Sequence, residues 1–196
     1  CRLCDLSNVN LEGANLSGAD LYYANLNGAI LNRADLTKAN LIAARLNDGS
    51  LYLANLSGAS LAEADLRRAD LVAANLINVN LNRADLNSAN LSEANLSRAN
   101  LGWADLRQTN LSNATMDQAL LINADITGAM VEPKILEHAH ICYSKTIDGT
   151  VSGCDLINRN LAGVDLSGTN LAGAIVTGAN LAGTNLAGTN LRGATL

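Results

Sequence analysis

Two histidines and one cysteine stand at alternate positions late in the sequence: His138, His140 and Cys142. Residues two apart on an extended strand point to the same side, so these three side chains have the spacing of a transition-metal site. The alternative is ordinary exposed histidines, and the sequence also lacks a Gly-rich phosphate loop between a strand and a helix. We therefore predict no enzyme, no metal site and no cofactor.

The composition excludes several functional classes. The net charge is -5, and the 13 Lys and Arg residues are scattered, whereas nucleic-acid binding needs clustered basic residues. No apolar run approaches the roughly 18 residues of a membrane span, and no stretch reads as a signal peptide. Because the sequence starts at Cys1, we expect a processed chain or an excised segment. Source and compartment do not follow from the composition.

A five-residue phrase fills most of the sequence, as in "ADLNSANLSEANLSRANL". From Leu6 to Leu111 every fifth residue is Leu, and Met116, Leu121, Ile126 and Val131 continue the column. A small residue, usually Ala, stands two positions before each Leu, with Asp or Asn between them. A period of five matches neither an amphipathic helix nor a plain alternating strand. The pattern indicates a repeat architecture.

Each repeat specifies an inward side and a turn. Ala and Leu are two apart and fall on one side of an extended backbone, while the Asp or Asn between them points away. The two residues after Leu then turn the chain, and stacked coils pair about 4.8 Å apart. Over nearly the whole chain this A(D/N)Lxx pattern resembles the pentapeptide-repeat family, which is largely bacterial and includes cyanobacterial members. The resemblance implies an all-β fold, a right-handed quadrilateral β-helix (solenoid) with four repeats per coil.

The phrase stops and resumes once, which defines three segments of one domain. Residues 1-130 are expected to form the pentapeptide-repeat β-helix, residues 131-155 an irregular, hairpin-like excursion, and residues 156-196 C-terminal coils of the same β-helix. Pro133 has no N–H for a strand ladder and marks where the wall is left. Thr146 then falls where a Leu belongs.

The excursion contains a hairpin signal, Asp148-Gly149. A three-residue loop at 147-149 places Gly at the left-handed position, whereas a two-residue turn would misalign the cysteines by one. The three-residue loop pairs these residues: Cys142 with Cys154, Ser144 with Ser152, and Thr146 with Thr150. Many cyanobacterial pentapeptide-repeat proteins carry a similar Cys, Asp-Gly, Cys excursion. We predict a Cys142–Cys154 disulfide, with two free thiols as the alternative.

The cysteine pairing sets the expectation for compartment. A bridged pair implies the periplasm or the thylakoid lumen, and free thiols imply the cytoplasm. Cys1 and Cys4 fall on the inward columns and are interpreted as small core fillers. A zinc site joining all four cysteines is excluded, because about seven coils, or roughly 33 Å, separate the two pairs.

Four carboxylates twenty residues apart are expected to form one acidic column: Asp65, Asp85, Asp105 and Asp125. Some pentapeptide-repeat proteins protect DNA gyrase by imitating duplex DNA, so the resemblance implies this role as the alternative function. Against it, Asp is a common residue of the repeat, Arg67 and Arg107 lie beside the column, and Arg45 interrupts it.

Outward apolar residues gather at two places near the N-terminus. One face carries Tyr22, Tyr23 and Ile42, and the opposite face carries Tyr52, Leu53 and Val72. We interpret them as partner-contact candidates, the alternative being isolated surface side chains. The predicted function is a noncatalytic rigid scaffold for protein–protein interaction, with an unknown protein partner, no direct nucleic-acid contact and no membrane span. Because both ends stop in register, an end-to-end homodimer is also expected.

Overall fold

The computed structural model describes residues 1–149, 154, 156–157, 161–162, 166 and 171–196. Regular elements in this part are short: strand β1 (Leu120–Ile122), helix α1 (Pro133–Leu136) and strand β2 (His140–Cys142). β1 and β2 pair in parallel, with Leu121 opposite Ile141. Elsewhere the wall consists of single parallel bridges, because each side of a coil is only about one paired residue long.

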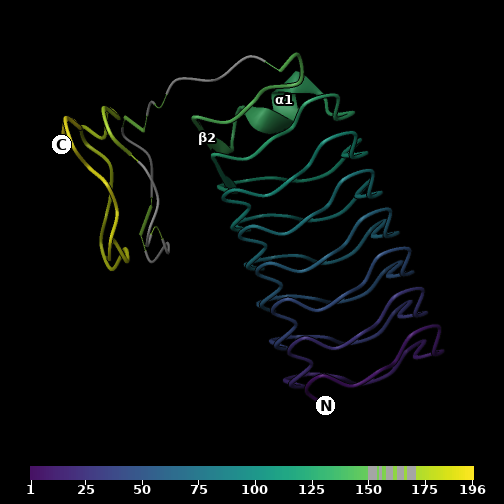
Figure 1. Ribbon diagram of the computed structural model, residues 1–196. Helices are drawn as coiled ribbons and strands as arrows, with labels where there is room; N and C mark the ends of the chain where they lie inside the picture. The colour runs from purple at the N-terminus through teal and green to yellow at the C-terminus, as the bar shows by residue number, and fades with distance from the viewer. Residues whose placement is uncertain (150–153, 155, 158–160, 163–165, 167–170) are drawn as a thin grey trace.

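The bridges join residues twenty apart, from Asp5 with Asn25 to Asp125 with Lys145. Twenty residues are four repeats, so each coil has four sides. Successive coils stack into a right-handed quadrilateral β-helix (Figure 1). The fold class predicted from the repeat is confirmed.

Each corner is a hydrogen-bonded turn. The N–H of Ala14 donates to the carbonyl of Leu11 at 3.0 Å, and the residue before Ala14, Gly13, has a φ of +64°. A positive φ at the third position is the requirement of a type II turn. Many corners hold a residue other than Gly in this conformation, for example Arg33 at +58°. A residue at this corner position must therefore adopt the left-handed conformation, whatever its type.

The inward columns form the core, as the repeat predicts. Leu86 and Leu96 are fully buried, and Ala84 is 1 % exposed. Each such Leu contributes about 1.5–3 kcal/mol through removal of its apolar surface from water. The Asp and Asn side chains between Ala and Leu point outward and remain partly exposed.

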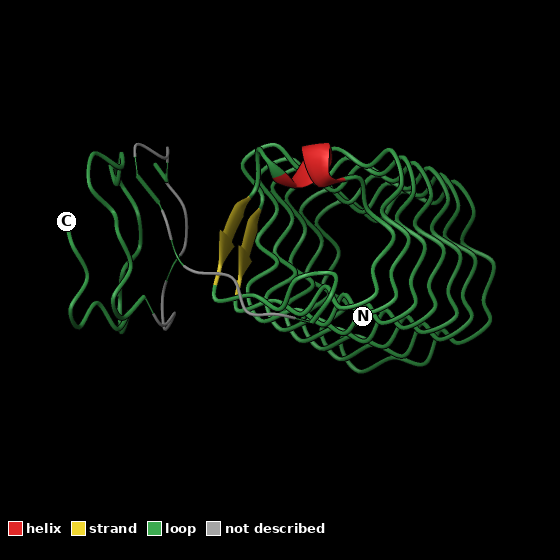
Figure 2. Cartoon of the chain, turned by 90° about the horizontal axis from the view of Figure 1, so that it is seen from above, coloured by secondary structure: helices red, strands yellow, loops and turns green. Residues whose placement is uncertain are grey.

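The core divides into two clusters. The first extends through the coils from Leu21 to Ala139. The second joins outward residues of β1 and β2 to inward residues of the C-terminal coils: Leu120, Ile122, Cys142, Cys154, Leu156, Leu161, Leu166, Leu171, Ala174 and Val176. Figure 2 shows β1 and β2 on the side of the coil stack that faces the C-terminal coils. Residues 156–196 also pair among themselves, as at Ile175 with Thr195. That residues 156-196 continue the same β-helix as residues 1-130 stays a prediction.

The ladder is interrupted at α1 for a reason that the repeat register reveals. Pro133 lies twenty residues after Asn113, a corner residue with a φ of +58°. The proline ring holds φ near −65°, so this corner cannot form. Lys134 would next fall on the inward Ala column. The chain instead places Pro133 in the first turn of α1, where its fixed φ suits a helix. Besides the missing N–H, the fixed φ is a second constraint that interrupts the wall at this corner.

Among the described residues, no helix has the length and apolar character needed to cross a bilayer.

Candidate functional site

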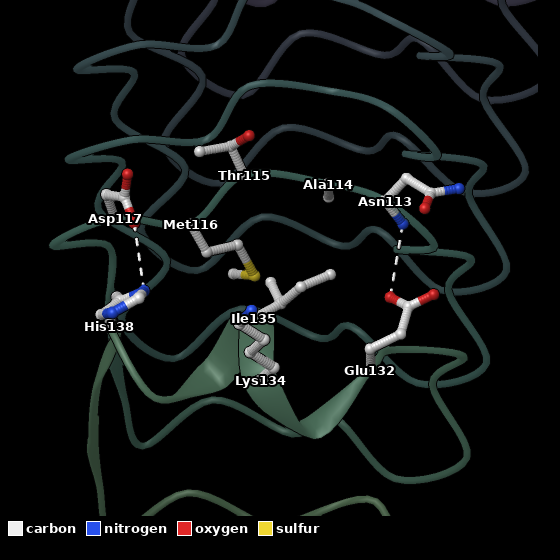
Figure 3. Close-up of a pocket in the computed structure, with 9 residues that line it drawn as sticks. All are labelled: Asn113, Ala114, Thr115, Met116, Asp117, Glu132, Lys134, Ile135 and His138. Carbon is white, nitrogen blue, oxygen red and sulfur yellow. Dashed lines mark hydrogen bonds and ion pairs between the residues drawn. The ribbon is translucent and has the colours of Figure 1, made fainter.

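A pocket of about 400 Å³ lies between the wall and α1. The wall side is residues 113–117, and the other side is formed by Glu132, Lys134, Ile135 and His138 (Figure 3). Its size is at the lower end of ligand pockets, which span roughly 300–1,000 Å³. The pocket exists because α1 replaces a section of wall. It was not predicted from the sequence.

Two polar contacts border the pocket. The backbone N–H of Asn113 donates to Glu132 Oε2 at 3.3 Å. In a regular coil the equivalent N–H donates to a backbone carbonyl, as Arg33 does to Tyr52 at 2.9 Å. A side chain has therefore replaced part of the ladder. At the opposite rim, His138 Nδ1 lies 3.5 Å from Asp117 Oδ1, and both side chains are exposed.

The structure separates the candidate metal-binding residues. His138 lies at the pocket rim, whereas His140 and Cys142 belong to β2 and are buried on the outer side of the wall. In the part of the chain that the structure describes, no three His, Cys, Asp or Glu side chains converge as a metal site would require.

The predicted acidic column stacks as successive bridge partners: Asp65, Asp85, Asp105 and Asp125. All four carboxylates lie close to a basic side chain: Asp65 to Arg67 at 2.7 Å, Asp85 to Arg67 at 3.6 Å, Asp105 to Arg107 at 2.5 Å and Asp125 to Lys145 at 3.0 Å. The hydrogen bonds from Arg67 are the largest cause that lowers the pKa of Asp65. For Asp105, burial opposes ionisation, but the hydrogen bonds from Arg107 outweigh it and lower the pKa.

The face that carries this column is nearly balanced in charge. Its residues 5–8, and the equivalents every twenty residues up to 145–148, contain seven Asp against four Arg and one Lys. Arg68 forms two hydrogen bonds of 2.7 Å with Asp48 and is the main cause that lowers the pKa of Asp48 to about 2. The face is therefore a mosaic of ion pairs rather than a continuous acidic strip.

The first predicted contact trio forms a cluster with a basic residue. The rings of Tyr22 and Tyr23 meet edge to face with centroids 4.6 Å apart. The Arg2 guanidinium lies 5.2 Å from the centroid of Tyr22, within cation–π range. Ile42 is half-buried on the next coil, where its carbonyl accepts from the N–H of Tyr23.

The second predicted trio lies on the opposite face. Tyr52 is 39 % and Leu53 41 % exposed, and Val72 is half-buried on the adjoining coil. The N–H of Leu53 donates to the carbonyl of Val72 at 3.0 Å, so the three residues are neighbours.

The outward apolar residues that the sequence analysis missed include Trp103, Leu120 and Ile122. Trp103 is 46 % exposed at a corner, while Leu120 and Ile122 are buried beneath the C-terminal coils. A signal existed for the last two: in "ALLIN" both neighbours of the inward Leu121 are apolar, although such positions are usually polar.

The cysteines form two pairs. The sulfurs of Cys142 and Cys154 lie 2.17 Å apart, and the two residues form an antiparallel bridge, as expected for the hairpin. The expected partners Thr150 and Ser152 lie outside the described residues. The interpretation of Cys1 and Cys4 as core fillers was wrong for Cys1, which is exposed, whereas Cys4 is half-buried and packs against the core. Their sulfurs lie 2.25 Å apart.

A family model described as pentapeptide repeats matches eight copies across the chain, over residues 1–37, 34–71, 64–102, 99–132, 152–186 and 177–196. Among solved structures, HetL is 36 % identical, and the match covers 100 % of this chain and 88 % of HetL with a TM-score of 0.43. HetL is a pentapeptide repeat protein involved in heterocyst differentiation regulation from the cyanobacterium Nostoc sp. strain PCC 7120. A comparison with curated proteins gives no match.

QnrB1, a plasmid-mediated fluoroquinolone resistance protein, is also similar in structure. Two trypsin-treated forms are 18 % and 17 % identical, with TM-scores of 0.57 and 0.59. The matches cover 90 % and 95 % of this chain and 76 % and 82 % of the QnrB1 chains. At such low identity the likeness concerns the fold alone.

Proposed function

This chain belongs to the pentapeptide-repeat family, and from that premise we propose that it is a noncatalytic, rigid scaffold that binds a partner protein. The inter-coil ladder supports this role, because it fixes each outward side chain at a set height and on a set face. A partner would meet a preorganised surface, which lowers the entropy cost of binding.

The observation that carries the proposal is the set of large apolar side chains at left-handed corners. Tyr23, Leu53 and Trp103 have φ values of +55°, +57° and +60° and are 49 %, 41 % and 46 % exposed. A left-handed conformation costs such residues about 1–2 kcal/mol, and their exposure returns little of it. Gly occupies other corners, such as Gly58 at +66°. Neither burial nor backbone preference accounts for these three residues, whereas partner contact does.

The face with Tyr22 and Trp103 is the favoured contact surface. Tyr, Trp and Arg are the residue types that dominate binding energy at protein interfaces, and Arg2 stacks on Tyr22 here. Tyr23 and Trp103 stand on one corner column four coils apart, or about 19 Å by the spacing of strands. A single partner protein that covers this distance along the face can contact both residues.

A quantitative pull-down from the native host tests the proposal. Trp103→Gly and Tyr23→Gly remove the side chains and keep a residue that accepts the left-handed corner. Arg83→Gly, on the same column, is the matched control. We expect a protein captured by the unmodified chain and by Arg83→Gly to be lost with Trp103→Gly or Tyr23→Gly. Equal recovery with all four chains would refute contact through these corners.

The alternative is a DNA-mimicking protector or inhibitor of gyrase. The unbroken stacking of Asp65, Asp85, Asp105 and Asp125 favours it, and the ion pairs that all four of them form count against it. A supercoiling assay with added protein separates the two functions. The scaffold predicts no change in gyrase activity, with or without a fluoroquinolone.

We also infer a compartment from the Cys142–Cys154 pair. Disulfides persist in oxidising compartments, so the pair supports the periplasm or the thylakoid lumen over the cytoplasm. Mass spectrometry of alkylated, unreduced protein from its native compartment should recover the two cysteines joined. Recovery of both as alkylated thiols would refute the assignment.

A further inference from the structure

On each side of a regular coil, one residue makes a pair of backbone hydrogen bonds to the coil below. Asn95, for example, lies above Asn75: its N–H donates to the carbonyl of Ala74 at 3.0 Å, and its own carbonyl accepts from the N–H of Leu76 at 2.8 Å. One extended residue thus satisfies one acceptor and one donor of the coil below. The same pair recurs along the wall.

The pair is missing above Thr115. The residue twenty positions on is Ile135, but its N–H donates to the carbonyl of Glu132 at 2.9 Å within α1. Among the described residues, nothing accepts from the N–H of Met116 or donates to the carbonyl of Ala114. Met116 is 1 % and Ala114 5 % exposed. A buried donor or acceptor left unpaired costs about 1–3 kcal/mol.

The chain cannot close this gap with the segment that normally would. Pro133 cannot adopt the left-handed corner, and Lys134 cannot enter the inward Ala column without burying its charge. The wall resumes directly afterwards, where the N–H of His140 donates to the carbonyl of Ala119 at 2.8 Å. The opening is therefore a local feature that the sequence imposes within an otherwise paired wall.

The opening coincides with the pocket of Figure 3. Met116 lies on the wall side and Ile135 on the α1 side, so the interior between them is apolar. Charged groups stand at the rim, including Glu132 and the pair of Asp117 with His138. An apolar interior with one unpaired donor and one unpaired acceptor matches a peptide backbone with apolar neighbours.

We propose that this pocket binds a short extended peptide from a partner protein, which adds one residue in parallel opposite Thr115. The N–H of that residue donates to the carbonyl of Ala114, and its carbonyl accepts from the N–H of Met116. Its neighbours point inward, so the recognised segment alternates apolar, polar, apolar, like the A(N/D)L phrase of the wall. Strand addition to an exposed edge is a general mode of peptide recognition. The site is separate from the corner residues Tyr23 and Trp103, so either proposal can fail alone.

Hydrogen exchange measured by NMR gives the first test. In the free protein the Met116 amide should exchange much faster than the Leu111 amide, which donates to Met130 at 2.8 Å. A capped synthetic peptide, acetyl-ANLSG-amide, should slow exchange at Met116 at least tenfold. The same peptide N-methylated at its Asn cannot donate to Ala114 and should have no effect.

Two results would overturn the proposal. One is a Met116 amide that is as protected as Leu111 in the free protein. The other is unchanged exchange at about 1 mM peptide, the weakest affinity that a useful site would have, near −4 kcal/mol.

Pocket-filling variants give the second test. Ile135→Trp should occupy the pocket and weaken peptide binding at least tenfold. Ile77→Trp is the matched control, because Ile77 is an outward, half-exposed residue of the same face outside the pocket. Circular dichroism checks that both variants fold. Unchanged binding by a folded Ile135→Trp overturns the proposal, and if that variant is unfolded, the exchange experiment on the unmodified protein decides.

Discussion

The wall up to residue 132 and the segment from Pro133 onward contain the same repeated phrase but differ in regularity. In the first region Leu81, Leu86 and Leu91 are at most 1 % exposed. In the second, Leu161 and Leu166 are equally buried, but Leu181 and Leu186 of the last coil hold the equivalent inward positions and are only half-buried. The inward Leu is necessary but does not secure burial, because a coil shields its core only when coils stack on both sides.

The transition between the two regions occurs at a corner. β1 still pairs with β2 and Asp125 with Lys145, so the sides of the coil that follow α1 remain intact. What is lost lies around Pro133, where the turn requires a positive φ. The corner residue controls the solenoid as strictly as the inward residue does, although the repeat pattern allows almost any residue there.

Truncation of an inward Leu should be the most costly change in the regular wall. Leu86→Ala should lower the free energy of unfolding by about 2–5 kcal/mol, because neighbouring coils are too rigid to fill the cavity. Leu186→Ala should cost clearly less, since its side chain is already half-exposed. Urea denaturation measures both, with the outward Asn87→Ala as control. Similar losses for Leu86 and Asn87 would contradict the inward assignment.

Loss of the Cys142–Cys154 disulfide should act on one region only. Opening so short a loop removes about 2–3 kcal/mol, and the effect should be confined to the C-terminal coils. Hydrogen exchange of the unmodified chain and of the double variant Cys142→Ser with Cys154→Ser checks this at two equivalent amides, because a reductant would also open the Cys1–Cys4 pair. Leu171, which donates to Asn190, should exchange faster, whereas Leu71, which donates to Asn90, should not change. Equal acceleration at both sites would mean that the two regions unfold as one unit.

Repair of the corner should make the second region resemble the first. The double substitution Pro133→Gly with Lys134→Ala restores a residue that accepts a positive φ and a small inward residue. Two ladder hydrogen bonds at Ala114 and Met116 then become possible, which together add about 1–3 kcal/mol. Thermal unfolding should show the gain, and the Met116 amide should become protected. Lys134→Ala alone is the control. If this single variant gained the same stability, the fixed φ of Pro133 would not be the constraint that keeps the corner from forming.

The smallest expected effect concerns the ion pairs of the regular wall. Arg67→Ala should lower the free energy of unfolding only slightly at neutral pH, because solvent screens an exposed ion pair. The folded pKa of Asp65 is lowered from 3.8, so its contribution is complete above about pH 4 and is lost as pH falls through the folded pKa. Chemical denaturation at pH 7 and at about pH 2 compares the variant with the unmodified chain. A difference that persists unchanged in acid would exclude the Asp65 carboxylate as its origin.

The fold was predictable because its rules are local. A five-residue period fixes which side chains point inward, and Tyr52 and Leu53 were recognised as outward by the same count. Trp103 follows the same rule, because its position two residues after the inward Leu101 places it at an outward corner. Leu120 and Ile122 were missed for a physical reason: an outward apolar residue shows no sign in the sequence of what will cover it.

The five-residue pattern predicted the inward columns and the place where the wall is interrupted, because both depend on backbone alternation and turn conformation within a few residues. The twenty-residue coil was predicted from the family resemblance, because the pattern alone does not set the number of sides. Only the tertiary structure decided which outward residues are covered and which ladder groups remain unpaired. The C-terminal coils bury Leu120 and Ile122, and α1 leaves the N–H of Met116 without a partner in the described chain. Both outcomes depend on how segments distant in sequence pack together, and a repeat of five residues carries no information about that packing.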